Sequence, residues 1–256
     1  MLRVGADGTK NGGGFRSHIC PKDRLYRFIP IPDKKSKLIT SKALTYNDYK
    51  WNNQSVRDYL PPRIWGVDAR NQYIHDDPEF KTFTYGSPRF NKKDDQGKQD
   101  KNYGTLEQMQ KGDMLTFYAA FAENGQDIEG YYFFAYFIVD CVIKYGNRED
   151  LKKDEKALVK GNHHFIHRPR NQIIIKGDDR KSRFLERAVL LSSRKKDRRG
   201  HNYYPCKNMQ KMLACKDMQK ILGGYYKSMN FSSIRNICLP ESGITLFKQY
   251  LDNNGG

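Results

Sequence analysis

Two aromatic and β-branched runs in the middle of the chain constrain its fold more than any other feature. The first, MLTFYAAF, covers residues 114–121, and the second, YYFFAYFIVDCVI, covers 131–143. The segment between them, AENGQDIEG, carries turn residues, so the two runs predict a β-hairpin with a long loop. Both faces of the second run are apolar, which predicts a central strand in a closed or covered sheet.

Weaker patterns around this hairpin predict an α+β fold. Residues 144–160 are mostly charged and predict a surface excursion. Residues 184–189 have the spacing of a short helix or a packed turn. The other expected elements are a short strand over 25–31, a short helix over 105–109, a strand over 172–175, and helices over 209–222 and 244–251. Strands in the middle and helices near the C-terminus therefore predict one α+β domain.

The charge of the chain favours a polyanionic partner. Lys and Arg outnumber Asp and Glu by 46 to 29, which gives a formal net charge of +17. Such a charge attracts polyanions through counterion release, and its combination with 13% aromatic residues is typical of nucleic-acid-binding proteins. The alternative is a basic protein whose charge only maintains solubility.

The same sequence gives an expectation for the compartment. Five cysteines without a CxxC pair favour a reducing environment. The N-terminal residues have no signal-peptide core, and the apolar stretch 131–139 is shorter than the roughly 20 residues that span a bilayer. We therefore expect a soluble, cytoplasmic protein without a membrane partner.

Several short segments follow one another in a specific order. They are GADGTKNGGGF, PIP, DPEFKTFTYG, KGDMLTFYAAF, GYYFFAYFIV, NHHF and KGDDRKSRFLERAVLLS. In this order they resemble the third family of nucleotide-modification-associated domains, which is found near genes for modified bases in DNA. The middle and late segments are also similar to the wider PUA-like class, which includes the ASCH, EVE and YTH domains.

The resemblance implies a fold and a kind of ligand. The expected fold is a PUA-like mixed β pseudo-barrel with flanking helices, formed by residues 1–193. Residues 194–256 would form a basic helical extension packed on it. The pseudo-barrel would hold a base or nucleotide, often a modified one. No catalytic residues and no cofactor come with the resemblance.

A nucleotide removed from its stack needs flat partners and polar groups at the edge of its base. Tyr118 is the first candidate for an accessible ring, because its hydroxyl requires water or a partner. The alternative is that the aromatic residues of this strand are core, and that Asp113 beside it only caps a turn. The further candidates for nucleotide contact are Tyr85, Asn11, Asn162, His163, His164, Ser182 and Arg183.

The polar run around the three histidines 163, 164 and 167 allows more than one interpretation. The imidazoles could bind a metal or transfer protons. Pro169 and the lack of helical flanks instead favour a loop or strand with basic groups directed at phosphate, so no metal site is expected. The predicted phosphate contacts are Arg168, Arg170, Arg180, Lys181, Arg194, Lys195, Lys196, Arg198 and Arg199.

An enzymatic alternative depends on acidic residues. Asp76, Asp77 and Glu79, with Lys81 nearby, could hold a divalent cation for a metal-dependent nuclease or a base-modifying enzyme. Against this, Pro78 fixes a local turn within the acidic run. The sequence therefore predicts first a nucleic-acid-binding protein that recognises a base, with DNA favoured over RNA. A nucleotide-modification or restriction system is a candidate partner.

Overall fold

The predicted hairpin forms the centre of the molecule. The computed structural model describes residues 2–4, 16–20, 22–33, 44–64, 66–76, 78–87, 103–122, 128–196, 202–205 and 241–256. Strand β11 (Met114–Ala122) pairs antiparallel with β12 (Ile128–Asn147), which confirms the hairpin. All but the first residue of β11 are buried, as its aromatic and β-branched composition predicts.

The first half of strand β12 is central, as predicted, because it has strand partners on both sides. On the side of β12 that does not pair with β11, the first half of β12 pairs with β14 (Arg183–Lys196). The second half of β12 pairs with β13 (Arg170–Gly177). β13 and β14 are thus one antiparallel partner, interrupted at 178–182. Across this interruption the amide of Asp178 donates to the Ile138 carbonyl at 2.7 Å, and the Ile138 amide donates to Ser182 Oγ at 3.1 Å.

The prediction of a short helix or packed turn over 184–189 is wrong, because these residues belong to β14. Phe133 of β12 pairs with Val189, and Ala135 pairs with Phe184. Pairing with the free side of β12 satisfies the backbone hydrogen-bonding groups of residues 184–189. The apolar spacing of these residues fits a strand as well as a helix. The strand predicted over 172–175 is confirmed as part of β13.

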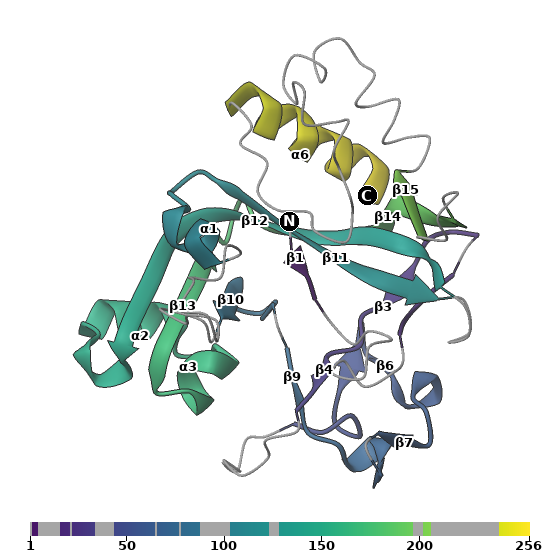
Figure 1. Cartoon of the computed structure of the whole chain (residues 1–256), viewed down its shortest axis with the longest axis horizontal. Helices are drawn as coiled ribbons and strands as arrows, with labels where there is room; N and C mark the ends of the chain where they lie inside the picture. The colour runs from purple at the N-terminus through teal and green to yellow at the C-terminus, as the bar shows by residue number, and fades with distance from the viewer. Residues whose placement is uncertain are drawn as a thin grey trace.

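The sheet curls into a half-barrel (Figure 1). β10 (Thr84–Ser87) pairs with the outer side of β13, and β2 (Ser17–Ile19) pairs with β11. β1 (Leu2–Arg3) runs parallel to β11, and β3 (Tyr26–Arg27) extends the sheet from β2. A single bridge between Leu25 and Arg187 joins the start of β3 to β14, so the curled edges meet at that point.

The inner face of the curl is packed with aromatic side chains. Phe28, Phe117, Phe121, Phe134 and Phe137 are all fully buried there. Their rings make edge and stacked contacts, for example 5.0 Å between the ring centroids of Phe28 and Phe134. Among the described residues, the inside of the curl is therefore a hydrophobic core.

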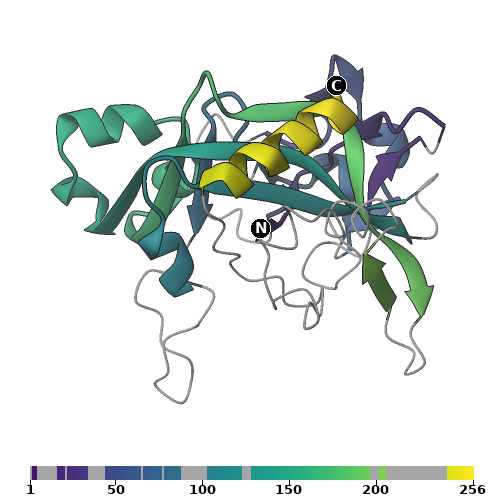
Figure 2. The same cartoon turned by 90° about the horizontal axis from the view of Figure 1, so that it is seen from above.

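Helix α6 (Glu241–Gly255) covers the opposite face of the sheet (Figure 2), which confirms the predicted final helix. Leu251 is fully buried, and Phe247 makes an edge contact with Phe133 at 5.6 Å between ring centroids. Gly255 lies against Leu185 of β14, where an added Cβ would be 2.9 Å from that side chain. The helix predicted over 209–222 lies outside the described residues.

A small unit built from residues between 29 and 76 lies beside the sheet. Tyr46 is at the centre of its core, and its hydroxyl donates to the Pro30 carbonyl at 2.7 Å. Its strands pair as β4 (Ile31–Pro32) with β9 (Ile74–His75), β5 (Lys50–Trp51) with β6 (Gln54–Ser55), and β7 (Arg63–Ile64) with β8 (Val67–Asp68). Two short 3₁₀ helices, η2 (Arg57–Tyr59) and η3 (Ala69–Asn71), complete it.

The remaining helices lie around the second half of β12. Helix α1 (Tyr103–Gln108) confirms the short helix expected before β11. The excursion expected over 144–160 starts later than predicted, because β12 continues to Asn147; it then forms η5 (Arg148–Asp150) and α2 (Lys153–Val159). Helix α3 (His163–His167) follows. None of the described helices combines the length and apolarity that crossing a membrane requires.

Candidate functional site

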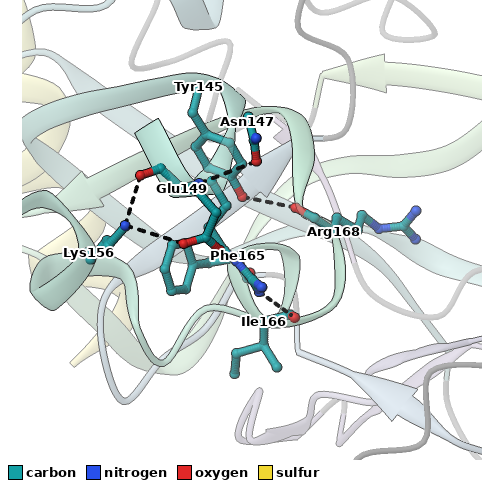
Figure 3. A network of polar contacts seen from close by, with 8 residues as sticks. Tyr145, Asn147, Glu149, Lys156, Phe165, Ile166 and Arg168 are labelled. Atoms are coloured by element: carbon teal, nitrogen blue, oxygen red, sulfur yellow. Dashed lines mark hydrogen bonds and ion pairs between the residues drawn. The ribbon is translucent and has the colours of Figure 1, made fainter. Parts of the chain in front are cut away.

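Helix α3 forms where the sequence favours a loop or strand, so that prediction is wrong. The side-chain oxygen of Asn162 caps its first turn, accepting from the amides of His164 at 3.0 Å and Phe165 at 3.3 Å. At the other end, Arg148 Nη1 donates to the carbonyls of Phe165 and Ile166, both at 3.0 Å (Figure 3). Side chains thus satisfy backbone groups at both ends of a helix that is too short to be stable alone.

Two buried polar residues hold α3 on the sheet. Asn162 Nδ2 donates to Thr84 Oγ1 of β10 at 3.0 Å, and His164 Nδ1 lies 2.9 Å from Gln172 Oε1 of β13. Asn162 is fully buried and His164 is 4% exposed. Both were predicted to contact a nucleotide. In the structure they anchor the helix, so a contact surface at this place has to be formed by their neighbours.

One side of α3 meets a carboxylate from the small unit. His163 Nε2 lies 3.4 Å from Asp33 Oδ2, and both side chains are largely buried. The backbone amide of His163 donates to Glu79 Oε1 at 3.2 Å. The rings of His163 and His167 are in contact, tilted by 43° with 4.3 Å between their centroids. We refer to Asp33, Glu79, His163, His167 and Arg168 together as the α3 corner.

The α3 corner unites groups that are distant in the sequence. Glu79 of the predicted acidic run and His163 are 84 positions apart. The sequence did not mark Asp33 as a site residue. The sequence feature that pointed to Asp33 is its position directly after the extended IPIP segment. In the structure, Pro32 of this segment pairs with Ile74, close to the acidic run.

Burial and charge both act on the histidines of the corner. Partial burial lowers the pKa of His167, and the neighbouring His163 lowers it further. The carboxylate of Asp33 opposes this shift, whereas Arg168 adds to it. A neutral His167 is therefore favoured at neutral pH, although an added negative charge would favour its protonated form.

Arg168, the residue that follows α3, adds a cation to the corner. Its carbonyl accepts from the hydroxyl of Tyr145 at 3.1 Å, which fixes the backbone. Its side chain points away from the network around Tyr145 and Phe165 (Figure 3). The Nε atom is buried and has no hydrogen-bond partner among the described residues. Arg170, two positions further, is exposed at the start of β13.

The predicted phosphate contacts fall into separate groups. Arg168 and Arg170 lie at the start of β13, whereas Arg180 and Lys181 follow its end, after about 23 Å of strand. Lys181 lies 3.7 Å from Asp178 in that turn. Arg194, Lys195 and Lys196 belong to the end of β14, and Arg198, Arg199 and Asn11 lie outside the described residues.

Two further candidates have structural roles. Ser182 is 7% exposed and accepts from the Ile138 amide, so it fixes the interruption between β13 and β14. Arg183 keeps a half-exposed side chain, and its Nη1 lies 3.3 Å from Asp252 Oδ1 of α6. This ion pair joins the sheet to the final helix.

The prediction that the ring of Tyr118 is accessible is wrong. Tyr118 is 7% exposed and packs edge-on against Tyr131 at 5.8 Å, on the face that α6 covers. Tyr85 is half-buried at the edge of the inner core, with its ring 5.6 Å from that of Phe117. Asp113 caps its turn by accepting from the Gln110 amide at 2.7 Å, as the structural alternative predicts.

The acidic run does not form a metal site in the described part of the chain. Asp76 acts on the small unit, where burial and then its charge raise the pKa of Tyr46. Asp77 lies outside the described residues, and Lys81 is exposed in the turn before β10. Among the described residues, no three His, Cys, Asp or Glu side chains come together as metal ligands would.

The fold and the site define an α+β protein with a curled half-barrel sheet and a cationic and carboxylate corner at its edge. Residues 1–218 match the family described as nucleotide modification associated domain 3, and the chain belongs to that family. This membership associates the chain with nucleotide modification. No curated protein and no solved structure matches it.

Proposed function

We propose that this chain binds nucleic acid as part of a nucleotide-modification process. It would contact a nucleotide, in particular a modified one, at the α3 corner. The observation that carries the proposal is the buried Nε of Arg168, which lacks a hydrogen-bond partner among the described residues and belongs to the same corner as the imidazoles of His163 and His167. A guanidinium placed in this way binds phosphate well, because it is always charged and offers several donors in one plane.

The packing of the sheet supports a site at its rim. Aromatic side chains fill the inner face of the curl, and α6 covers the outer face. The corner lies where α3, β10 and the end of β4 come together. A curled sheet that offers a ligand site at its rim agrees with a PUA-like fold, which we include in the proposal.

The charge of the chain supports a polyanionic ligand. Several lysines with few acids occur in 34–43 and 206–240, in addition to the cations on β13. Neutralising phosphates with such residues releases counterions, which strengthens binding at low salt. We favour DNA over RNA, with a nucleotide-modification or restriction system as partner, because of the family's association with modified bases.

Binding to labelled DNA and RNA tests this function. Duplex and single-stranded oligonucleotides, with and without modified bases, would be titrated by fluorescence anisotropy over a range of salt concentrations. We expect Arg168→Ala to weaken binding and to reduce the slope of log K against log salt by about 0.9 for each lost phosphate contact.

A matched control is available at the other end of β13. Arg180 is exposed in the turn that follows the strand, at the opposite end of β13 from Arg168, so Arg180→Ala removes an equal charge from a different place. We expect a smaller change in affinity from this variant than from Arg168→Ala. Equal effects of the two variants would remove the α3 corner from the proposal, and no binding of any nucleic acid at low salt would remove the function.

A further inference from the structure

We propose that the α3 corner binds a phosphate group of a nucleotide together with a proton, so that affinity falls as the pH rises through neutrality. This inference rests on the proposed function and adds the ionic form of the site. It is argued from the two imidazoles in contact, from the carboxylate beside one of them and from the guanidinium that follows the helix.

The spacing of the two histidines limits how many protons they hold. With 4.3 Å between the ring centroids of His163 and His167, two positive charges would repel strongly in a partly buried place. Asp33 Oδ2 lies 3.4 Å from His163 Nε2, and the Asp33 carboxylate opposes the lowering of the His167 pKa. Because burial and His163 lower the pKa of His167, a proton on His167 is favoured by an additional negative charge nearby.

A proton on His167 makes the group of charges around α3 more favourable for an anion. Asp33 follows β4 and lies 3.4 Å from His163 Nε2, and the Glu79 carboxylate accepts from the His163 amide. His164, held by Gln172 of β13, is buried on the side towards the sheet. Arg168 and a protonated His167 are two cations beside the carboxylates of Asp33 and Glu79, and a phosphate group offers negative oxygens to both cations.

The coupling between phosphate binding and proton uptake is measurable because His167 is mostly neutral before binding. Partial burial and the neighbouring His163 lower the pKa of His167 below its usual value. The ring is then mostly neutral at neutral pH, and a bound phosphate would raise its pKa again. By linkage, a group that gains a proton on binding makes the affinity change by up to about tenfold per pH unit between the two pKa values.

Calorimetry in buffers of different ionisation enthalpy counts the protons taken up. Two duplexes of one sequence would be compared, one with a 5′-phosphate and one with a 5′-hydroxyl, between about pH 6 and pH 8. We expect uptake of up to about one proton on binding. A stronger effect with the 5′-phosphate would identify a terminal phosphate as the ligand, and equal effects would identify an internal phosphodiester.

Two variants locate the coupling. His167→Asn removes the titrating ring and should abolish proton uptake and flatten the pH dependence, whereas Arg180→Ala should leave both unchanged. Circular dichroism of His167→Asn would verify that the variant is folded. Binding of DNA with the same affinity across this pH range, and without proton uptake, would overturn the inference and leave the proposed function in place.

Inorganic phosphate provides a test that does not depend on DNA binding. Histidine resonances followed by NMR should show the pKa of His167 rising on addition of phosphate. If no nucleic acid bound but this shift occurred, the function would fail and the phosphate site would stand. If phosphate left the titration of His167 unchanged, the site itself would be refuted.

Discussion

Substitution of Gly86 by alanine tests how tightly α3 is held against the sheet. Gly86 lies in β10, and a Cβ added there would be 2.5 Å from Cγ and 2.6 Å from Cβ of His164. Ordinary contacts between carbon atoms are about 3.5–4.0 Å, so the imidazole or the strand would have to move by roughly 1 Å. Neither group is at the far end of a flexible side chain, so a small side-chain movement cannot remove the clash.

The contacts of His164 set the size of the effect. Its ring is held by Gln172 at 2.9 Å, and its amide is held by the Asn162 side chain at 3.0 Å. Moving the ring would strain both bonds, and overpacking of this kind typically costs about 1–3 kcal/mol. In a chain of this size, each kcal/mol lowers the melting temperature by about 2–4 °C.

Gly146 is a matched control for this substitution. It lies in β12 outside the left-handed region of φ, and no atom would lie within 4 Å of an added Cβ. Gly146→Ala should leave stability unchanged or raise it by up to about 1 kcal/mol, because it restricts the unfolded chain. Urea denaturation of both variants provides the comparison. Equal free energies of unfolding would refute the claim that His164 is fixed against β10.

Three other substitutions test the packing of the fold. Leu251→Ala should lower the free energy of unfolding by about 2–5 kcal/mol, because this fully buried side chain holds α6 on the sheet; an unchanged urea midpoint would contradict that. Asn162→Ala should cost about 2 kcal/mol through the lost helix cap and the lost bond to Thr84, and Asn162→Asp, which keeps the cap acceptor, should cost less by thermal denaturation. Burial raises the pKa of Tyr145 to about 12, so the unfolded chain loses this phenolic proton first and stability should fall as the pH rises above about 10; Tyr145→Phe should lose less stability over that range than the parent protein.

Local composition determined the centre of the fold and its last helix. The aromatic and β-branched runs at 114–121 and 131–143 define the hairpin, since such residues fit a buried strand wherever it pairs. The apolar spacing of Ile244, Phe247 and Leu251 likewise predicts α6, because one face of a helix is a property of sequence spacing alone. Asp113 is a third example, since its cap involves only a residue three positions away.

Tertiary structure decided the elements and contacts whose partners are distant. Residues 184–189 form a strand because β12 offers them an open side, and α3 is a helix because Arg148 satisfies its last carbonyls. The meeting of Asp33 with His163 requires the small unit to lie against the helix. These contacts are strand pairing, helix capping by a distant residue and ion pairing. They depend on positions in space, which the local spacing of residues along the chain does not predict.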